Sequence, residues 1–524
     1  MAVGTRSSGP GRPHRAGRLT SAVPGCHERI AWLLRVNRRF ASGGRDVRLA
    51  GFAAELGGAG CAASAGQVSR WESGRVAVPY RAIVAYEKVL DLPRNSLVAI
   101  VDGVHRHGAG RPAPSRLDRQ VRTGDRAALT RAEDLLDLAL FGGEMTGADW
   151  DELTVLLTAF THVVMPGRSW DALAQRLLSE QLISDGDAWR QRSESTHRLL
   201  WLPASRPHVV AACAAVVRDP ASQIVIEPLA VLDVVDEPAV AALLAGQITE
   251  PAGERALRGA LLAGAVKVRC RQFSPDQLRR ITAAVLDMLT DPGRSAAVRP
   301  LAGELLGSLP PRLRAVALTR LRATSDRDPA PADGGGRSRA VVDRVTAPAQ
   351  SRADRAPDDM LTRLAGEMLF EANSDVRLHA AQMLGANPFR RDLADACCAE
   401  LRKAVVAGDP ALSAALLEAL PFVAGRRHRR TVETLVAAPG LPAETAASAA
   451  WSLAHVPGDS TDLFWATALR RPACRHGLTY ALGISGRQDW LARVRHDPAM
   501  PGEVRRAARW WSNLPAVVTR DARR

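Results

Sequence analysis

Apolar residues recur at helical spacing along the chain, and near its beginning they mark five short segments. Within Glu28–Phe40, the residues Ile30, Leu33, Leu34 and Val36 fall on one stripe of a helix. Four further short helices are predicted downstream, in the segments Val47–Leu56, Ser64–Glu72, Pro79–Pro93 and Asn95–Val101. Together they indicate a compact helical unit over residues 27–102.

A weak repeat of helical patterns occupies the later part of the chain. In each clear copy a β-branched residue is followed four residues later by Ala, and Asp or Pro-Gly precedes several copies. The clearest copies begin at Val298, Val376 and Val504, and weaker ones begin at Leu412 and Thr445. The starts at 376, 412 and 445 lie 36 and 33 residues apart. A turn and then a small residue at a helix crossing is what stacked helix pairs require.

Two stretches without apolar periodicity divide the chain. Residues 103–127 carry six arginines, and residues 324–359 are rich in Pro, Gly, Asp and Arg. The predicted organisation is a disordered basic arm at 1–26, a helical unit at 27–102, a basic linker at 103–127, a helical domain at 128–323, a disordered linker or insertion at 324–359, helical repeats at 360–516 and a tail at 517–524.

The composition favours an all-α fold. Hydrophobic residues make up 46% of the 524 residues, which is enough for packed cores, whereas aromatic residues make up only 4%. Cores built mainly from Ala, Leu and Val suit closely packed helices better than a sandwich or a barrel.

Positive charge is concentrated in the first quarter of the chain. Residues 1–126 hold 21 Lys and Arg against nine Asp and Glu, whereas residues 127–524 hold 49 against 46. The scarcity of Lys indicates a GC-rich genome, but codon bias does not explain why the excess collects at one end. The asymmetry predicts that the first part of the chain meets a polyanion.

Cysteine usage and hydropathy indicate a cytoplasmic protein. The seven cysteines include no CxxC pair, which is typical of reduced thiols rather than a disulfide framework. The longest clear apolar stretch, Val209–Val217, is about half a membrane span. The first 25 residues lack the apolar region of a secretory signal. We therefore expect no membrane partner.

The second and third predicted helices carry a motif. Phe52–Ala53 lies in the second helix, and Ser69–Arg70–Trp71–Glu72–Ser73–Gly74 ends the third. This arrangement resembles the Cro/phage-repressor (XRE) family of helix-turn-helix proteins, typical of bacteria, over roughly residues 27–102. The resemblance implies that the third helix binds double-stranded DNA. One departure is Gly58–Ala63, which stands where the family usually has a single apolar residue and lengthens the turn by five residues.

The candidate DNA contacts lie on and around the third helix. Ser64 can cap this helix, whose N-terminus favours a phosphate. Gln67 can donate to and accept from the major-groove edge of adenine, and Arg70 suits guanine or a phosphate. The XRE resemblance assigns Gln67, Ser69 and Arg70 to reading or clamping DNA. A solvated helix face is the alternative for Gln67 and for Arg70.

Other residues near the motif divide into two groups. Arg48 and Arg75 complete the set of predicted DNA contacts, and Arg35, Arg38 and Arg39 are further candidates to line phosphates. Val68 and Trp71 are expected to point into the core, and Glu72 is expected to have a structural role.

The later repeat resembles HEAT-type repeats, in which helical hairpins stack into an α-solenoid. The resemblance is clearest over 360–516, extends to 250–323 and is only compositional over 128–249. The Trp-Leu-Gly-Tyr pattern of TPR repeats is missing. The expected fold is therefore all-α, with an N-terminal five-helix helix-turn-helix domain followed by an α-solenoid of HEAT-like helical hairpins, which implies an extended interaction surface.

Familiar catalytic motifs are absent from the sequence. It contains no P-loop, no HExxH and no nucleophile elbow. We expect His105–Arg106–His107 to be solvated in a linker and Cys397–Cys398 to be buried thiols. The tryptophans expected in the core are Trp451, Trp465, Trp490, Trp510 and Trp511. We therefore expect no metal, no cofactor and no enzymatic activity.

These patterns favour a sequence-specific transcriptional regulator associated with the nucleoid. Its helical body is expected to sense a ligand, bind a protein or peptide partner, or mediate homodimerisation. One alternative is a DNA-tethered scaffold for phage defence or chromosome association. Another is a HEAT-like DNA glycosylase, but the near-neutral charge of 127–524 argues against the basic concave face that such an enzyme uses.

Overall fold

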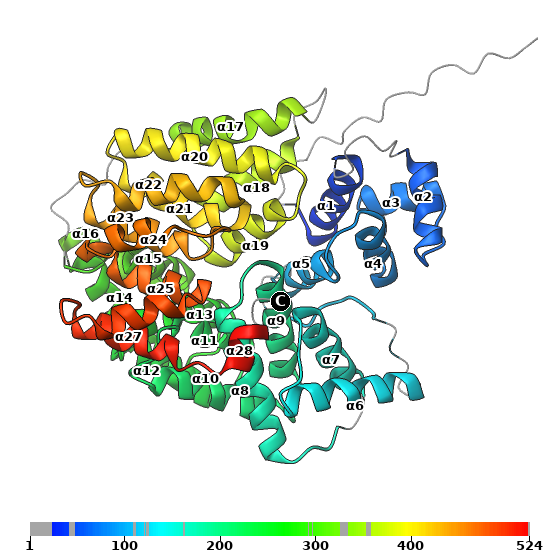
Figure 1. Ribbon diagram of the computed structural model, residues 1–524, viewed down its shortest axis with the longest axis horizontal. Coiled ribbons are helices and arrows are strands. Elements are labelled where there is room, and N and C mark those ends of the chain that lie inside the picture. Colours follow the sequence, from blue (N-terminus) through cyan, green and yellow to red (C-terminus); the bar gives the residue numbers. More distant parts are fainter. Residues whose placement is uncertain are drawn as a thin grey trace, which may run out of the picture.

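The computed structural model describes residues 24–40, 48–107, 112–119, 121, 125–160, 163–291, 293–295, 297–324, 334–352 and 358–521. Within these ranges every regular element is a helix and there is no strand, so the predicted all-α class is confirmed for them. No helix of this part combines the length and apolar character needed to cross a membrane. Three parts follow one another along the chain: a small N-terminal unit and two halves of a larger helical body (Figure 1).

The N-terminal unit contains five short helices, each overlapping a segment predicted from the sequence. They are α1 (Cys26–Phe40), α2 (Leu49–Gly58), α3 (Ala65–Glu72), α4 (Tyr80–Val89) and α5 (Ser96–His107). Phe52 and Tyr86 are buried in its core, where their rings meet edge to face with centroids 4.8 Å apart. α3 packs on α1 and α2, and α5 packs on α1 and α4.

The first half of the body extends from α6 to α16. Its helices are α6 (Arg126–Leu140), α7 (Gly147–Ala159), α8 (Gly167–Ile183), α9 (Gly186–Trp201), α10 (Arg206–Arg218), α11 (Ile226–Ala230), α12 (Pro238–Thr249), α13 (Glu254–Arg269), α14 (Pro275–Thr290), α15 (Val298–Ser308) and α16 (Pro311–Thr324), with the 3-10 turn η1 (Val231–Val234) after α11. Alternate helices pack on one another: α7 on α9, α11 on α13 and α13 on α15 in one row, and α8 on α10 and α12 on α14 in another.

The second half has the same alternation. Its helices are α17 (Gly334–Arg352), α18 (Asp359–Phe370), α19 (Ser374–Gly385), α20 (Arg390–Val406), α21 (Pro410–Val423), α22 (Arg429–Ala437), α23 (Ala443–Leu453), α24 (Asp462–Ala468), α25 (Arg475–Ser485), α26 (Gln488–His496), α27 (Gly502–Ser512) and α28 (Ala516–Asp521). In the row from α19 through α21, α23 and α25 to α27, each helix packs on the next. The predicted repeat starts Val376, Leu412, Thr445 and Val504 each occupy the third position of a helix in this row.

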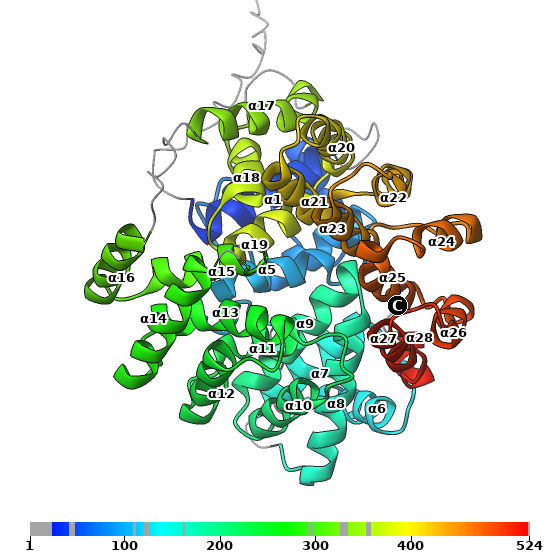
Figure 2. The same cartoon turned by 90° about the vertical axis from the view of Figure 1, so that its left-hand side faces the viewer.

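The two halves touch each other at several places, among them Asp185 with His455 at 3.5 Å and Arg255 over the ring of Trp451, and they hold α5 between them. Near α19, Arg269 contacts Asp375 at 3.3 Å and the Ser374 hydroxyl donates to Glu304 at 2.8 Å. Elsewhere, α28 packs on α8. α5 packs on α9 of the first half and on α19 of the second, and it lies between the halves in Figure 2.

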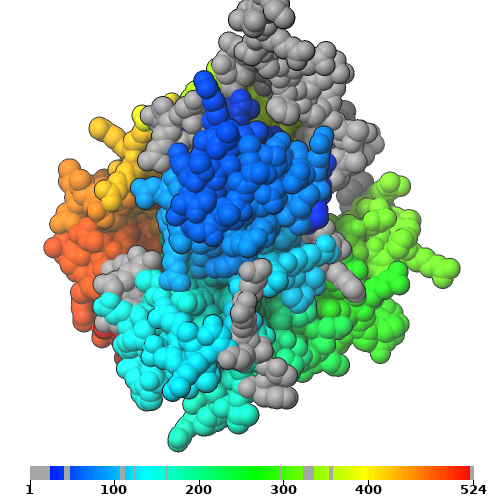
Figure 3. Space-filling view, turned by 90° about the vertical axis from the view of Figure 1, so that its right-hand side faces the viewer, coloured from blue at the N-terminus to red at the C-terminus, as the bar shows by residue number. Residues whose placement is uncertain are grey.

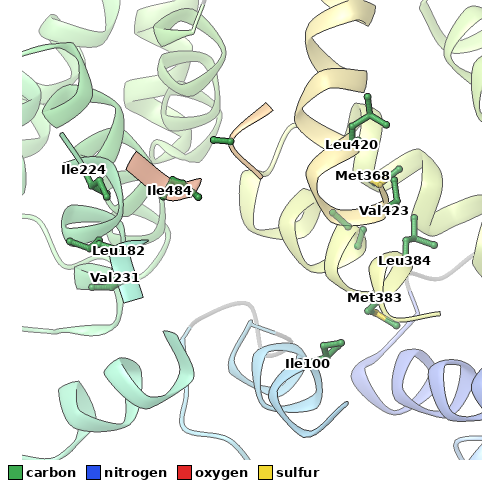
Figure 4. Close-up of a cluster of buried hydrophobic side chains, with 14 of the residues drawn as sticks. Ile100, Leu182, Ile224, Val231, Met368, Met383, Leu384, Leu420, Val423 and Ile484 are labelled. Atoms are coloured by element: carbon green, nitrogen blue, oxygen red, sulfur yellow. The ribbon is translucent and has the colours of Figure 1, made fainter. Parts of the chain in front are cut away.

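α5 joins all three parts. Ile100 of α5 is buried, and Figure 4 shows it near Met383 of α19, with Leu182 and Val231 of the first half farther off across the view. The N-terminal unit therefore covers the middle of one face of the body, as Figure 3 shows.

The predicted disordered linker at 324–359 is wrong for Gly334–Arg352, which forms α17. Val341, Val345 and Ala349 are buried, and α17 packs on α18 and α20. Their spacing is that of one helix face, but the stripe is narrow and Gly, Pro and Arg on either side of it dominate the composition. Residues 325–333 and 353–357 lie outside the described residues.

The other predicted boundaries also need correction. Within the predicted linker 103–127, the segment 103–107 completes α5, and Arg119 is buried in ion pairs with Asp102 and Asp151. Within the predicted tail 517–524, Val518 of α28 is buried. Of the predicted basic arm, residues 1–23 lie outside the described residues and Cys26 begins α1.

Gly483 of α25 marks the closest approach to α27. A Cβ added there would overlap the buried indole of Trp511. We expect Gly483→Ala to lower the free energy of unfolding by about 1–3 kcal/mol, because overpacking displaces the ring. Chemical denaturation followed by circular dichroism measures this change.

Gly303→Ala in α15 is the matched control, because nothing lies within 4 Å of the added Cβ. Helix propensity predicts that it stabilises the protein by about 0.5–1 kcal/mol. Equal stabilities of the two variants would contradict the described packing of α25 on α27.

Candidate nucleic-acid interface

α3 begins with a reciprocal cap. The backbone N–H of Gln67 donates to Ser64 Oγ at 3.2 Å, and the backbone N–H of Ser64 donates to Gln67 Oε1 at 2.9 Å. This capping box satisfies two N–H groups at the start of the helix. The predicted N-cap at Ser64 is present. The side-chain oxygen of Gln67 is engaged in the cap, which leaves its Nε2 for contacts outside the protein.

The inward face of α3 is held by apolar burial and by one buried carboxylate. Val68 and Trp71 are buried, as predicted. The carboxylate of Glu72 accepts from Arg38 Nε at 2.6 Å, from Arg38 Nη2 at 2.5 Å and from the Tyr86 hydroxyl at 2.8 Å. Burial, followed by the charge of Glu72, raises the pKa of Tyr86, so its hydroxyl remains a donor. Glu72 therefore has a structural role.

The opposite face of α3 is open to solvent. Gln67 and Arg70 are exposed, Ser69 is half-buried, and Arg75 is exposed just beyond the helix. Within the described part of the chain, no carboxylate pairs with Arg70 or Arg75. Arg48 is exposed at the start of α2. The predicted DNA contacts therefore lie at the surface around α3, and the guanidinium groups of Arg70 and Arg75 are available to an anion.

The lengthened turn between α2 and α3 folds back onto the unit. Cys61 is buried, and its backbone N–H donates to the carbonyl of Leu56 at 2.8 Å. Burial raises the pKa of the Cys61 thiol, which acts as a small apolar residue here. Because Cys61 anchors the extra residues, α2 and α3 remain in contact despite the longer turn.

The prediction that the arginines of α1 line phosphates needs correction in part. Arg38, a candidate phosphate ligand, is buried in its ion pair with Glu72. Arg35 is half-buried, and its Nη1 donates to the backbone carbonyl of Glu72 at 3.2 Å. Arg39 is exposed over the ring of Phe40. Since one side of α1 packs on α3, its arginine-rich face is only partly available to a partner.

α1 attaches the unit to the second half of the body. Both terminal nitrogens of Arg29 donate to the carboxylate of Glu367 at 2.7 Å. The indole N–H of Trp32 donates to Asp358 at 2.9 Å. A bidentate pair at low exposure is more specific in its geometry than a surface ion pair. The orientation of α1 on α18 is thus closely defined.

α5 attaches the unit to the first half through buried charges. Arg119 and Arg198 both donate to Asp102 and both contact Asp151. Asp102 is 1% exposed and Asp151 is 0% exposed. Burial by itself would raise the pKa of Asp151, but the two guanidinium groups lower it to about 2. Both arginines therefore neutralise a carboxylate on α5 and another on α7.

Arg106 makes a second buried contact and corrects the prediction of a solvated His105–Arg106–His107 segment. Its Nη2 donates to Glu194 at 2.7 Å, and its Nη1 lies 2.8 Å from His197 Nε2. Because arginine only donates, His197 Nε2 accepts, and its Nδ1–H donates to Ser193 O at 2.6 Å. Burial lowers the pKa of His197 well below its usual value, in agreement with this neutral form.

A central cavity between the halves was not predicted from the sequence. Its volume is about 2100 Å³, and its wall includes residues of α5, α9, α11, α13, α15, α19, α21, α23 and α25. Trp451, expected in the core, lines this cavity beside Tyr480, with ring centroids 4.7 Å apart. No local motif marks this wall, because its residues come from helices far apart in the sequence.

Other predictions about the core are confirmed. Trp465, Trp490 and Trp511 are buried, whereas Trp510 is half-buried. Cys397 and Cys398 are buried free thiols, and burial raises the pKa of Cys397 to about 12. Among the described residues, no group of three or more His, Cys, Asp or Glu side chains is arranged to hold a metal ion.

The Arg38–Glu72 pair makes a prediction about the stability of this interface. We expect Arg38→Ala to destabilise the N-terminal unit by about 3–5 kcal/mol, because it leaves a buried carboxylate without its cation. Arg39→Ala, which changes the exposed neighbour, is the control and should change stability by about 0.5 kcal/mol or less. Hydrogen exchange of the amides in α1–α5 measures the effect, and equal protection in both variants would contradict it.

Comparisons with known proteins do not place this chain in a family. A scan against protein-family models finds no match, and a search of the curated proteins finds none. Any functional conclusion therefore depends on the geometry and charge of the surfaces described above.

Proposed function

We propose that α1–α5 form an XRE-type helix-turn-helix domain and that the protein is a sequence-specific DNA-binding regulator of transcription. The observation that carries this proposal is the asymmetry of α3. One face presents Gln67 and Arg70 to solvent, while Trp71 and Glu72 hold the other face in the core. A helix that packs one face into the core of its domain and exposes polar residues on the other face is the arrangement by which helix-turn-helix proteins bind in the major groove.

The dimensions of α3 suit this role. Like any α-helix, it is about 10–12 Å in diameter with its side chains. The major groove of B-form DNA is about 12 Å wide and admits one helix. α2 precedes α3 and packs on it, as the positioning helix of such a pair does.

The charge of the first part of the chain supports the proposal independently. Residues 1–126 carry 12 more basic than acidic residues. Neutralisation of phosphates by Lys and Arg supplies most of the nonspecific affinity for DNA and makes binding sensitive to salt. Arg48 and Arg75, which are exposed on either side of α3, are assigned to phosphates.

The cap of α3 refines the role of Gln67. Because its Oε1 accepts within the cap, its Nε2 is the group left to donate to DNA. A single donor reads an acceptor such as purine N7 or thymine O4, rather than the paired donor and acceptor of adenine. Arg70 then contacts guanine or a phosphate, and Ser69 clamps the backbone beside it.

For the body we propose an α-solenoid of HEAT-like hairpins that senses a ligand. The stacking of alternate helices and the common position of the four repeat starts in the second half support the solenoid. The central cavity, which has α5 of the proposed DNA-binding domain in its wall, supports ligand sensing over a role confined to binding partners or forming dimers.

Selection of binding sites from random duplex DNA, followed by genomic footprinting with the full-length protein, tests the proposal. A defined motif and a few strong genomic sites are expected. Broad coating of the chromosome would favour the scaffold alternative, and the absence of DNA binding would overturn both.

Arg70→Ala should weaken binding to the selected duplex. If its guanidinium holds a phosphate, the loss should be similar on all sequences, and the slope of log affinity against log salt should fall by about one. Arg337→Ala is the control, because Arg337 is an exposed arginine on α17, remote from α3. Fluorescence anisotropy at several salt concentrations measures both, and an unchanged affinity would remove Arg70 from the interface.

Gln67→Ala should relax the preference at one base position and cost about 0.5–1.5 kcal/mol of binding free energy, as expected for one hydrogen bond. Part of any loss of binding free energy comes from the loss of the helix cap. The chain offers a matched control for the effect of the cap. Ser274 and Gln277 form the same capping box at α14, so Gln277→Ala removes an equivalent cap elsewhere. A selected motif unchanged in Gln67→Ala would show that Gln67 does not read DNA.

A further inference from the structure

The charge of the cavity wall is opposite to that of the whole chain. Among the described residues, the wall carries 12 Asp and Glu against nine Arg and no Lys. The formal net charge of the chain is +15. The cavity volume, about 2100 Å³, is more than twice the upper range of about 1,000 Å³ for pockets that hold drug-sized ligands. A ligand that fills part of this space can therefore be long and carry positive charge.

Asp233 faces this cavity with an oxygen that lacks a donor. Its side chain is 6% exposed, and Oδ1 has no hydrogen-bond partner among the described residues. Lys267 and Arg106 are the nearby cations, and neither donates to Asp233 Oδ1. Lys267 donates to the carbonyl of Val235 and Arg106 to Glu194, while Arg106 Nε is itself buried without an acceptor. A buried acceptor without a donor is costly, so this oxygen is suited to a donor brought by a ligand.

The electrostatic surroundings of Asp233 favour a cationic donor. Burial, followed by the nearby carboxylate of Asp375, raises the pKa of Asp233 to about 7. Two carboxylates in one buried region destabilise each other's charge, and a cation placed between them relieves this repulsion. An ammonium group provides both the charge and the missing hydrogen bond.

Arg258 on α13 has a donor group that lacks an acceptor. It is half-buried in the cavity wall, and its Nε is buried without an acceptor. Within the described ranges no carboxylate pairs with it; Glu254 and Glu418 act on it only through their charges. Arg255, one turn earlier, instead donates to the carbonyl of Gln223 at 3.1 Å. Arg258 is therefore suited to bind an anionic group such as a carboxylate.

These two positions lie at different depths along the same helix. α11 approaches α13 at Gly259, where Ile226 contacts the helix, and Lys267 bonds to Val235 just beyond η1. Asp233 in η1 is thus close to the axial level of Lys267, which lies nine residues after Arg258 and on the opposite side of α13. That separation is about 13 Å along the helix axis at 1.5 Å per residue. Leu262 lines the cavity between them.

We propose that the central cavity binds a linear zwitterion, with its ammonium group at Asp233 and its carboxylate at Arg258. The axial separation of about 13 Å corresponds to about four residues of extended peptide with free termini, at about 3.3–3.6 Å per residue, and any displacement across the helix lengthens the ligand that is required. This inference deepens the ligand-sensing role proposed for the body and rests on it.

Arg106 connects this site with the proposed DNA-binding domain. It lies on α5, lines the cavity, and its charge acts on Asp233. An ammonium group at Asp233 changes the field at Arg106 and thereby the contacts of α5 with Glu194. Occupancy of the cavity can therefore alter the position of α5 relative to the body.

Calorimetric titration of the full-length protein without DNA tests the site. The probes are tetraalanine with free termini, its N-acetylated form, its C-terminal amide, and dialanine. Tetraalanine should bind, and each of the other three should bind about tenfold or more weakly, the effect expected from losing one charge-assisted hydrogen bond.

Two variants assign the ends of the ligand. In Asp233→Asn, tetraalanine and its N-acetylated form should bind equally, and in Arg258→Gln, tetraalanine and its amide should bind equally. Glu444→Gln and Arg337→Gln are the controls, because each removes one exposed charge of the same sign from the cavity wall. They should keep the wild-type preference for free termini.

Absence of tetraalanine binding, equal binding of the capped forms to the wild-type protein, or variants that behave like their controls would overturn the proposal. The capped probes test the wild-type protein, so the proposal stays testable even where a variant fails to fold. These titrations contain no DNA. Their failure would therefore overturn the cavity site alone, and a failure to bind DNA would not overturn the cavity site. Tetraalanine should also change the affinity for the selected duplex, and Asp233→Asn should abolish that change.

Discussion

Asp102 and Arg106 lie one helical turn apart on α5, and both are buried in ion pairs with the first half of the body. Moving a charge out of water costs several kcal/mol even after relaxation, so such groups persist only where their partners are correctly placed. Arg198 and Glu194 of α9 supply two of these partners. A small shift of α5 would leave charges buried and unpaired, and this cost restricts α5 to one position between the halves.

The placement of α5 has consequences on both of its sides. α1 and α4 pack on α5, and α3 packs on α1, so α3 lies farther from the body than α1 and α5 do (Figure 1). On the other side, α5 contributes Arg106 to the wall of the central cavity. The proposed DNA-reading surface and the proposed ligand site are thus connected through α1 and α5. Coupling between two sites requires an element that both can bias, and α5 lines the cavity and packs on α1, which in turn packs on α3.

The five N-terminal helices and the inner row of the second half follow from local patterns. The apolar stripe of α1, the cap at Ser64 and the repeat starts at Val376 and Leu412 all act within a few residues, so spacing reveals them. α17 was missed, because a narrow stripe of Val and Ala carries little signal among Gly, Pro and Arg. Its helix depends on the contacts that α18 and α20 provide.

Sequence alone determined the helical class, the position of the motif on α3, and which of its residues are apolar anchors and which are polar. These properties depend on side-chain type and helical period, and both are local. Only the tertiary structure decided that Arg38 is an internal partner of Glu72 while Arg70 stays exposed, since both are arginines on helices of basic character. It also decided that Asp233 and Arg258 face one cavity. Burial and pairing of charge depend on residues distant in the chain, and no spacing along the sequence encodes that distance in space.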